Sequence, residues 1–382
     1  MKVAHVQHPY YPELGYQENH LPAKQQELGH EVRIFTSDYL PRSSENVGTG
    51  WFKYNGVPTV RLKALPNIKS ISKVDLRGLW RELKQFNPEI IHSHGLHSLY
   101  TLQNLFYSYL NGIDLFVDVH IDNDNFHINS LFKWIGFQAH KHILLPLINQ
   151  KVKKFLPVNP YAKQFLKEDL GITPSRIELL PLGVDTSVFS PNTDPTSLRV
   201  ELGIQQEEQV LISSGNLNET KDLGILIRAF EMISEAHPDT RLLIVGPGPD
   251  TYLRKIRELV NETGLDDQVL FCGEVPHDDL PKYYNMADVG VWPGKLGITI
   301  IEAIGCGLPV IVCDSIATNF LIANDNGVSF ERGDPQALSG SIHQLISNPN
   351  EIKRYSDNAV EYAQNRLSWE KVAKRSVELY RE

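Results

Sequence analysis

The chain has 382 residues, of which 41% are hydrophobic and 22% charged, and its net charge is -9 at pH 7. This length favours two domains, because a single hydrophobic core stops growing beyond roughly 250–300 residues. The negative charge disfavours a general nucleic-acid binder, which usually carries a basic surface.

The first residues, MKVAHVQHPYYP, predict a strand and lack the long apolar core of a secretory signal. After them, short apolar runs alternate with longer amphipathic ones, the pattern of βα units with a parallel sheet. Several of these runs end in a polar residue or a histidine, as expected where strand ends line a crevice. The first half contains five expected strands, at residues 3–8, 31–37, 88–94, 115–120 and 154–159.

The second half restarts the pattern. Residues 222–236 predict a helix that buries one apolar face, formed by Leu223, Leu226, Ile227 and Phe230. We therefore expect an α/β protein of two Rossmann-like, doubly wound domains, with a proline-rich linker at residues 191–199. The expected strands are residues 209–216, 240–248, 268–275, 288–294 and 308–315. The expected domains are residues 1–192 and 193–365, followed by a helix at 366–382 that packs back on the first domain.

The cysteines give no sign of a disulfide framework, because they are three in number and all lie in the second half. Cys306 sits in a Gly-Cys-Gly turn and Cys313 in an apolar strand, which disfavours a catalytic thiol. No stretch approaches the roughly 18 apolar residues that span a bilayer. We expect a cytoplasmic protein, at most peripheral on the inner face of the membrane.

Residues 291–312 combine a glycine-bearing loop, a short helix and a buried strand. Gly297, Ile298 and Thr299 would offer free backbone amides at the helix start, which suits a diphosphate. Glu302 follows in an apolar helix, where its carboxylate would accept hydrogen bonds from ribose hydroxyls. The alternative is that Glu302 points into solvent.

A second candidate is Lys221, which stands just before the amphipathic helix at 222–236. A lysine there can reach a phosphate and stabilise a leaving diphosphate, although a solvated surface charge is the commoner role of such a residue. The turn GPGPD at 246–250 lacks the third glycine of a dinucleotide fingerprint, which disfavours a Rossmann dehydrogenase.

In the first half, Gly15 lies between the first strand and a helix, where a ligand can approach the backbone closely. His120 ends a strand and would hydrogen-bond a sugar hydroxyl, with a structural role as the alternative. No spacing of histidines, cysteines or acids resembles a metal site.

Residues 131–157 hold five lysines and no acidic residue, close to several aromatic side chains. They predict an amphipathic face for anionic lipid. The alternative is a pair of core helices whose lysines are solvated.

Taken in order, these stretches resemble the family 4 retaining glycosyltransferases of the GT-B fold. The resemblance rests on the loop at Gly15, the IIHSHG strand and ELLPLGVDTSVFSP at 178–191, and continues through the Lys221 loop, LLIVGPGPD, VLFCGEVPHDDLPKYYNMADVGVWP and ITIIEAIGCGLPVIV to NGVSFERGDPQALS. The ordered set is specific for the family and nearly silent about its substrate.

The resemblance implies a sugar transfer from a nucleotide-sugar donor to a glycan, lipid-linked or small-molecule acceptor, with retention of anomeric configuration. It assigns the donor diphosphate to Lys221 and the 297–299 backbone, the ribose to Glu302, and the transferred sugar to His120. The predicted donor site also includes Gly15, Gly215, Asn216 and Val275. No metal or other cofactor is expected, because cationic side chains and helix ends take over its role.

Three positions depart from the family pattern. Gly294 replaces a usual glutamate, Asn216 a usual arginine, and Tyr16 the second glycine of a Gly-Gly loop. An asparagine cannot neutralise phosphate charge, so either the substrates are unusual or catalysis is weakened. A non-catalytic nucleotide-sugar binding protein and a nucleotide-sugar epimerase therefore stay open as alternatives.

Overall fold

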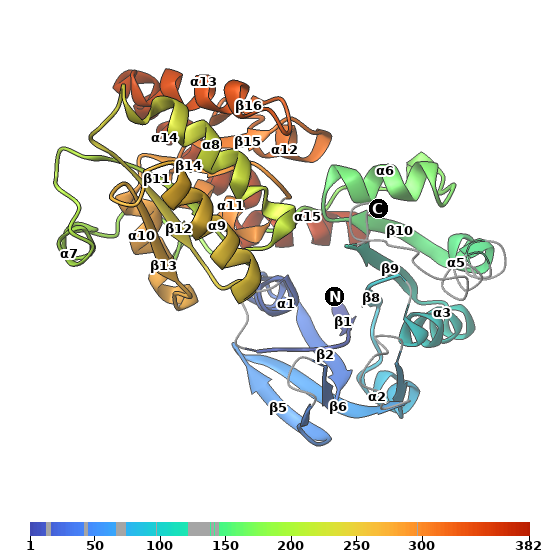
Figure 1. Cartoon of the computed structure of the whole chain (residues 1–382). Helices are drawn as coiled ribbons and strands as arrows, with labels where there is room; N and C mark the ends of the chain where they lie inside the picture. The colour runs from blue at the N-terminus through green and yellow to red at the C-terminus, as the bar shows by residue number, and fades with distance from the viewer. Residues whose placement is uncertain are drawn as a thin grey trace. The chain divides into compact units, whose positions relative to one another are not determined.

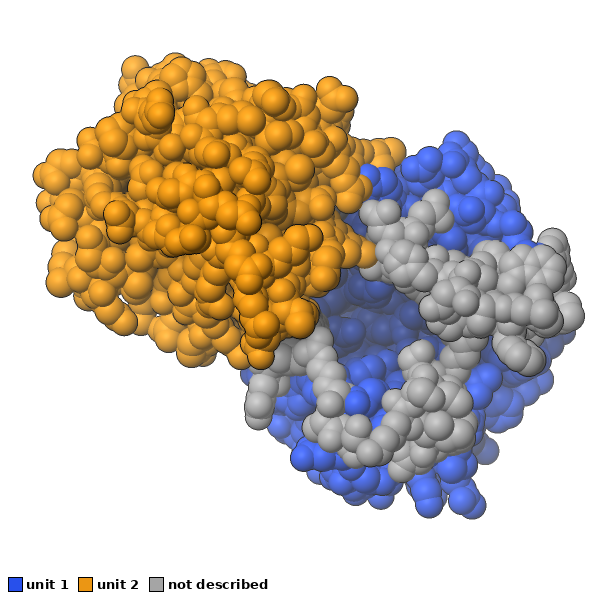
Figure 2. Space-filling model, viewed as in Figure 1, with its two compact units in different colours: residues 1–182, 369–382 blue, residues 183–368 orange. Residues whose placement is uncertain are grey.

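The computed structural model describes residues 1–12, 17–41, 45–65, 74–96, 98–120, 138, 141, 145–295 and 297–382. These residues form two compact units (Figure 1; Figure 2). Unit 1 comprises Met1–Leu182 and Trp369–Glu382, and unit 2 comprises Gly183–Ser368. Each unit has a largely or wholly parallel sheet and its own hydrophobic core, as the alternation of apolar runs and amphipathic segments predicts.

The sheet of unit 1 has the strand order β10-β9-β8-β1-β2-β6-β5. The pairs from β10 to β6 are parallel, whereas β5 and β7 each pair with β6 in antiparallel fashion. The order reverses on either side of β1, so the sheet is doubly wound. Its strands are β1 (Lys2–Val6), β2 (Glu31–Ser37), β5 (Gly50–Tyr54), β6 (Val57–Leu65), β7 (Asp75–Arg77), β8 (Ile90–His94), β9 (Asp114–Val119) and β10 (Val152–Pro157), with a separate pair β3 (Tyr39–Leu40) and β4 (Glu45–Asn46).

The helices of unit 1 connect these strands. Helix α6 has a typical capped start: Asn159 accepts a hydrogen bond from the amide of Ala162 and is followed by Pro160 in the first turn. The helices are α1 (Gln17–Glu27), α2 (Leu79–Phe86), α3 (Leu99–Asn111), α5 (Leu145–Lys151), α6 (Pro160–Glu168) and α15 (Trp369–Arg381).

Helix α15 comes from the far end of the chain and packs against α1 (Figure 1). Its Trp369 and Tyr380 are 2% exposed and share a core with Tyr10 and Phe116. Burying one such side chain contributes about 1.5–3 kcal/mol to the free energy of unfolding. The helix is therefore an integral part of unit 1.

Unit 2 has an entirely parallel sheet in the order β13-β12-β11-β14-β15-β16. The order reverses between β11 and β14, the position where open α/β sheets bind ligands. The strands are β11 (Gln209–Ser214), β12 (Thr240–Val245), β13 (Val269–Gly273), β14 (Val289–Trp292), β15 (Val310–Cys313) and β16 (Gly327–Phe330). The helices are α7 (Thr196–Glu201), α8 (Leu223–Ser234), α9 (Asp250–Glu262), α10 (Leu280–Met286), α11 (Ile298–Gly305), α12 (Ile316–Leu321), α13 (Pro335–Ile346) and α14 (Pro349–Tyr362).

The fold class expected from the sequence is confirmed, but the connection between the units lies elsewhere. The units divide after Leu182, whereas the sequence placed the first domain's end at residue 192 and the linker at 191–199. Residues 183–192 pack on unit 2, where the Val184 amide donates to the carbonyl of Leu367 at 2.7 Å and Phe189 is buried. Helix α7 begins inside the stretch expected to be a linker.

The expected apolar helix face and the expected lack of a membrane span can both be compared with the structure. The helical face expected at Leu223, Leu226, Ile227 and Phe230 is fully buried in α8. Within the described ranges, no helix is both long and apolar enough to cross a bilayer.

Candidate functional site

The candidate site of unit 2 lies at the carboxyl ends of β11 and β14. Two side chains bind the carbonyl oxygen of Ser214, the last residue of β11: Thr299 Oγ1 donates to it at 3.2 Å and Trp292 Nε1 at 2.9 Å. The Thr299 bond holds the first turn of α11 against the end of β11, and the Trp292 bond holds the end of β14 there. The switch point of the sheet thus brings together Ser214 and Thr299, which are 85 residues apart in the sequence.

The loop after β11 is in backbone contact with the loop after β12. A Cβ at Gly246 would lie 1.9 Å from the carbonyl oxygen of Gly215, so only glycine fits there. The amide of Leu217 donates to the carbonyl of Pro247 at 2.7 Å. The GPGPD turn therefore supports the loop that leads to Lys221.

Lys221 ends a 3-10 turn, Glu219–Lys221, and its ammonium is drawn inward. Its Nζ donates to the carbonyl of Lys295 at 2.9 Å and lies 3.2 Å from where a Cβ would stand at Gly297. Burial, helped by the charge of Lys295, lowers the pKa of Lys221 to about 8. The interpretation of Lys221 as a solvated surface charge is wrong.

Lys221 has no carboxylate within salt-bridge distance among the residues that the structure describes. The start of α11 lies beside it, with Gly297 as an N-cap that has no side-chain bond. The first amides of a helix have no intrahelical acceptor and carry partial positive charge. A half-buried ammonium and a helix start therefore converge, and the described residues place no acid close enough to pair with that ammonium.

Glu302 lies on α11, one turn beyond Thr299, and its side chain is only 4% exposed. His277 Nε2 donates to its Oε1 at 2.8 Å. Its Oε2 is buried and has no hydrogen-bond partner among the described side chains and backbone groups. The alternative that Glu302 points into solvent is wrong, and the unpaired oxygen is the kind of acceptor that a ligand hydroxyl would satisfy.

His277, which the sequence analysis missed, begins the 3-10 turn His277–Asp279 after β13. The edge of its ring contacts Phe189, with the ring centroids 5.1 Å apart. The hydrogen bond to Glu302 raises the pKa of His277, although partial burial opposes it. The sequence could have pointed to His277, because it follows a predicted strand by a few residues, where the loops of a parallel sheet line its binding crevice.

Gly294 explains one departure from the family pattern. A Cβ at this position would stand 2.3 Å from the carbonyl oxygen of Thr220 and 2.6 Å from the carbonyl carbon of Lys221. The amide of Lys295 donates to the same Thr220 oxygen at 2.7 Å. The Lys221 loop therefore lies across residue 294, and no side chain fits there without moving that loop.

The remaining predicted donor residues are more scattered. Gly215 adjoins both Lys221 and Thr299, since a Cβ there would lie 3.9 Å from Lys221 Cε and 3.4 Å from Thr299 Oγ1. Asn216 is exposed in the same loop, and Val275 is half-buried in the loop after β13. Gly15 lies outside the described residues.

A cavity of about 410 Å³ between α8 and α9 does not suit a diphosphate. Its lining includes several carboxylates, which would repel an anion. These are Glu219, Asp222, Glu258 and Glu262.

In unit 1, His120 directly follows β9, and its side chain is 40% exposed. Its Nε2 lies 3.5 Å from Oδ2 of the fully buried Asp118. Burial lowers the pKa of His120, but the Asp118 carboxylate outweighs it and raises that pKa to about 8. Asp118 also accepts a hydrogen bond from the Gly95 amide at 2.8 Å, so its position is fixed independently of His120.

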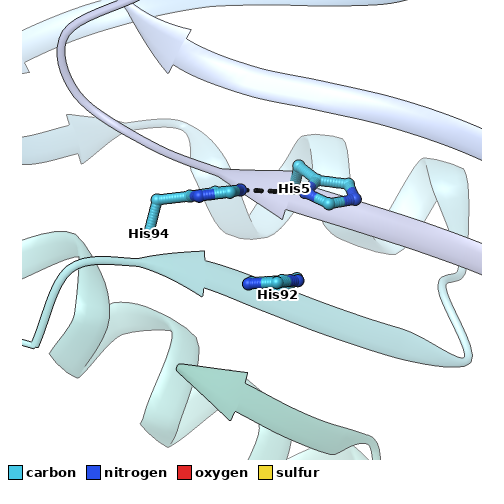
Figure 3. Close-up of side chains that lie close together, drawn as sticks. All are labelled: His5, His92 and His94. Atoms are coloured by element: carbon cyan, nitrogen blue, oxygen red, sulfur yellow. Dashed lines mark hydrogen bonds between the residues drawn. The ribbon is translucent and has the colours of Figure 1, made fainter. Parts of the chain in front are cut away.

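Three buried histidines lie close together: His5 on β1, and His92 and His94 on β8 (Figure 3). Oδ2 of Asp118 lies 3.7 Å from His92 Nε2 and 2.5 Å from His94 Nδ1. The rings of His92 and His94 are stacked, with centroids 4.6 Å apart and planes 4° apart. His5 uses one nitrogen to bond His94 at 2.9 Å and the other to bond Gln25 at 2.7 Å. Lone pairs lie in the ring plane, so stacked rings cannot aim them at one ion, and this geometry does not suit a metal.

The lysines of residues 131–157 that the structure describes in detail engage groups of unit 1. Lys153 pairs with Asp114 at 2.7 Å, and Lys154 lies near Glu178 and Glu382. Lys151 Nζ lies 4.2 Å from the ring centroid of Tyr109. These contacts do not favour a free basic face here, while residues 131–137, 139–140 and 142–144 lie outside the described part.

The two halves of the chain match two family models in tandem. Residues 20–188 match the model described as Glycosyltransferase Family 4, and residues 194–363 match the one described as Glycosyl transferases group 1. D-inositol 3-phosphate glycosyltransferase of Segniliparus rotundus is 30% identical over 54% of this chain and 47% of its own length. The chain spans about half the length of the curated relatives it matches.

Solved structures share the whole architecture. Sucrose-phosphate synthase from Thermosynechococcus elongatus has a TM-score of 0.74 at 21% identity, covering 100% of this chain and 98% of that one. Anabaena HepE in complex with UDP and glucose has a TM-score of 0.70 at 17% identity, covering 99% of this chain and 98% of that one. At these identities, the likeness establishes the fold alone.

Proposed function

Because this chain belongs to the group 1 glycosyl transferases and has their GT-B fold, we propose that it moves a sugar from a nucleotide-sugar donor to an acceptor hydroxyl, with retention of anomeric configuration. Unit 2 binds the donor in this proposal, and unit 1 carries the acceptor site and His120. The nucleotide complex of the HepE neighbour supports a nucleotide-sugar as the donor class.

One observation carries the proposal. The Lys221 ammonium is half-buried beside the start of α11, and the described residues supply no carboxylate to balance it. Both groups attract anions, and a diphosphate offers oxygens for each. Since the Lys221 ammonium and the positive end of the α11 dipole already meet there, we propose that the diphosphate is bound without a metal.

Glu302 is the proposed acceptor for the ribose. Its buried Oε2 has no partner in the described protein, and a ribose hydroxyl would supply the missing donor. The ribose would then lie within one helical turn of the diphosphate, because Glu302 and Thr299 are three residues apart on α11.

In the proposed reaction, the acceptor oxygen forms a bond with the anomeric carbon while the bond from that carbon to the diphosphate oxygen breaks. The acceptor proton passes to the departing diphosphate, which leaves on the same face of the sugar. Lys221 stabilises the negative charge that develops on the leaving oxygen. His120 hydrogen-bonds a hydroxyl of the transferred sugar and orients it.

A glycan or lipid-linked acceptor is part of the proposal, as is a cytoplasmic protein that contacts an anionic membrane through residues 131–157. The membrane contact has its own test, co-sedimentation with anionic liposomes. Absence of binding even to these liposomes would remove it without touching the transferase proposal.

The test of donor binding is a thermal shift with UDP, GDP, ADP, CDP and dTDP. A nucleotide at a hundred times its dissociation constant adds about 2.7 kcal/mol to the free energy of unfolding.

Lys221→Ala should abolish the shift and lower turnover by about two to three orders of magnitude. Lys353→Ala, at an exposed lysine of α14, is the matched control. An unchanged turnover in Lys221→Ala would contradict the assignment.

The second candidate function is nucleotide-sugar binding without transfer. It is favoured by the absence of a carboxylate at Gly294, where the backbone of Thr220 leaves no room for one. Binding of a nucleotide-sugar without transfer to any acceptor would support it over the transferase proposal.

A further inference from the structure

Glu302, the proposed ribose acceptor, is covered by His277. The carboxylate is 4% exposed, whereas the imidazole of His277, which bonds its Oε1, is 44% exposed. His277 therefore lies on the solvent side of the pair. A ligand that comes from solvent meets the imidazole before it meets the carboxylate.

We propose that His277 occupies the place of a ribose hydroxyl on Glu302 Oε1, and that nucleotide binding displaces it. This inference rests on the proposed function, because it requires Glu302 to bind the ribose. If His277 is displaced in this way, it belongs to the donor site. It then sets the difference in binding free energy between ligands that contain ribose hydroxyls and ligands that lack them.

The chemistry of the two partners supports the exchange. A buried carboxylate is costly unless donors satisfy its oxygens, and His277 is the donor that the described structure supplies to Oε1. The 2′ and 3′ hydroxyls of a ribose are two adjacent donors, which match the two oxygens of one carboxylate. A ribose can therefore replace the imidazole at Oε1 and also satisfy Oε2.

The position of His277 permits its departure. It begins a short 3-10 turn, and it is not enclosed by the core. Apart from Glu302, it contacts the ring of Phe189, and its Nδ1 lies 4.0 Å from the exposed Asp278. Rotation of the ring toward solvent would cost the Glu302 bond and keep Asp278 as a counter-charge.

The pH dependence has a definite sign. Glu302 faces His277 from α11 and Asp278 faces it from its own turn, and both carboxylates favour the protonated imidazole. As the pH falls through the pKa of His277, the imidazole binds Glu302 more strongly and competes better with ribose. Nucleotide affinity should therefore fall toward acidic pH in the wild type and should fall less in His277→Ala.

The experiment compares UDP, GDP and ADP with their 2′,3′-dideoxy forms by isothermal titration calorimetry. His277→Ala should bind whichever ribonucleotide the wild type binds about threefold to tenfold more tightly, the value of one hydrogen bond. The dideoxy form should gain no affinity, because it has no hydroxyl to take the vacated place. His237→Ala, at a histidine just before the amino end of β12, is the control and should change neither affinity, because His277 follows the carboxyl end of the parallel strand β13.

Two further measurements separate this inference from a purely structural role. In a Glu302→Ala background, which has no side-chain oxygen left for His277 to bond, adding His277→Ala should leave nucleotide affinity unchanged. By NMR titration, the pKa of His277 should fall when the nucleotide is bound, because the imidazole then loses its carboxylate partner. A histidine that only positions Glu302 would keep its raised pKa in the complex.

The possible results separate a failure of the His277 displacement from a failure of the donor site. If His277→Ala weakens the ribo and dideoxy ligands equally, or if the pKa of His277 stays raised in the complex, His277 is not displaced and the inference is overturned while the donor site stands. If no nucleoside diphosphate binds the wild type or His277→Ala, the proposed function fails and the inference fails with it.

Discussion

The carbonyl oxygen of Thr220 lies 2.3 Å from the position that a Cβ would take at Gly294. The family pattern places a carboxylate at this residue, and here the backbone of the Lys221 loop fills the space. The Lys221 loop can therefore hold its position only because residue 294 has no side chain.

We predict that Gly294→Ala lowers the free energy of unfolding by about 1–3 kcal/mol, because the new methyl group must push the Thr220 backbone away. Gly294→Glu should likewise fail to restore a family-like donor site, and nucleotide affinity should drop. Differential scanning calorimetry and nucleotide titration measure both effects. The control is Gly340→Ala in α13, where nothing lies within 4 Å of the new Cβ. If Gly294→Ala kept the stability and the nucleotide affinity of the wild type, the Lys221 loop would have moved aside at little cost, contrary to this prediction.

The pKa of Lys221, lowered to about 8, predicts a pH dependence of nucleotide binding. The protonated ammonium binds the diphosphate, so affinity should decrease as the pH rises through 8 and approach a tenfold loss per pH unit beyond it. The same lowered pKa of Lys221 also affects stability. Between pH 8 and 10.5 the unfolded chain binds more protons than the folded one, so this group makes the folded state more stable as the pH rises.

Calorimetric titration between pH 7 and pH 9.5 measures this dependence. Lys221→Met, which keeps the length of the side chain and removes the charge, should bind weakly with no step near pH 8. A wild-type affinity that stays constant over this range would mean that Lys221 does not bind the diphosphate.

Asp118→Asn should uncouple His120 from its charge partner. Asp118 is the main group that raises the pKa of His120, while burial lowers it. Without the carboxylate we expect the pKa of His120 to fall from about 8 to below 6.5. NMR titration of the histidine ring protons measures the change. Asp114→Asn, at the partly exposed partner of Lys153, is the control and should leave His120 unchanged.

Tyr380→Phe should destabilise unit 1 by about 1–3 kcal/mol. The hydroxyl of Tyr380 lies 2.5 Å from His92 Nδ1 and accepts a hydrogen bond from Gln25 Nε2 at 3.1 Å. Its removal leaves both buried groups short of a partner. Tyr109→Phe, at a tyrosine that is 59% exposed, should be nearly neutral. Thermal unfolding compares the two variants, and equal melting temperatures would rule out a structural role for the buried hydroxyl.

Much of the fold was predictable because the strands of both sheets are short β-branched runs with clear borders. The hairpin β5–β6 was not predicted, although its turn, Asn55-Gly56, has the residue pair typical of two-residue hairpins, and both residues have positive φ. The sequence of β5, GWFKY, does not alternate between apolar and polar residues, because an apolar residue, Trp51, occupies a position that is 55% exposed.

The candidate site was predictable only in part. Lys221 and Gly297 could be paired because both follow strands next to the switch point, which the order of βα units fixes. The bond between His277 and Glu302 could not be foreseen, since it joins a loop after β13 to a helix after β14 and depends on side-chain rotamers. The histidine cluster at Asp118 likewise arises from the register of β1 and β8, in which His5 pairs with His92.

Helix α15 has a consequence for biosynthesis. Residues that complete the core of unit 1, among them Trp369 and Tyr380, leave the ribosome only after all of unit 2. The first half of the chain must therefore wait, with its α1 face uncovered, while all of unit 2 is made. Unit 2 has a contiguous sequence, so we expect it to complete its core before unit 1 does.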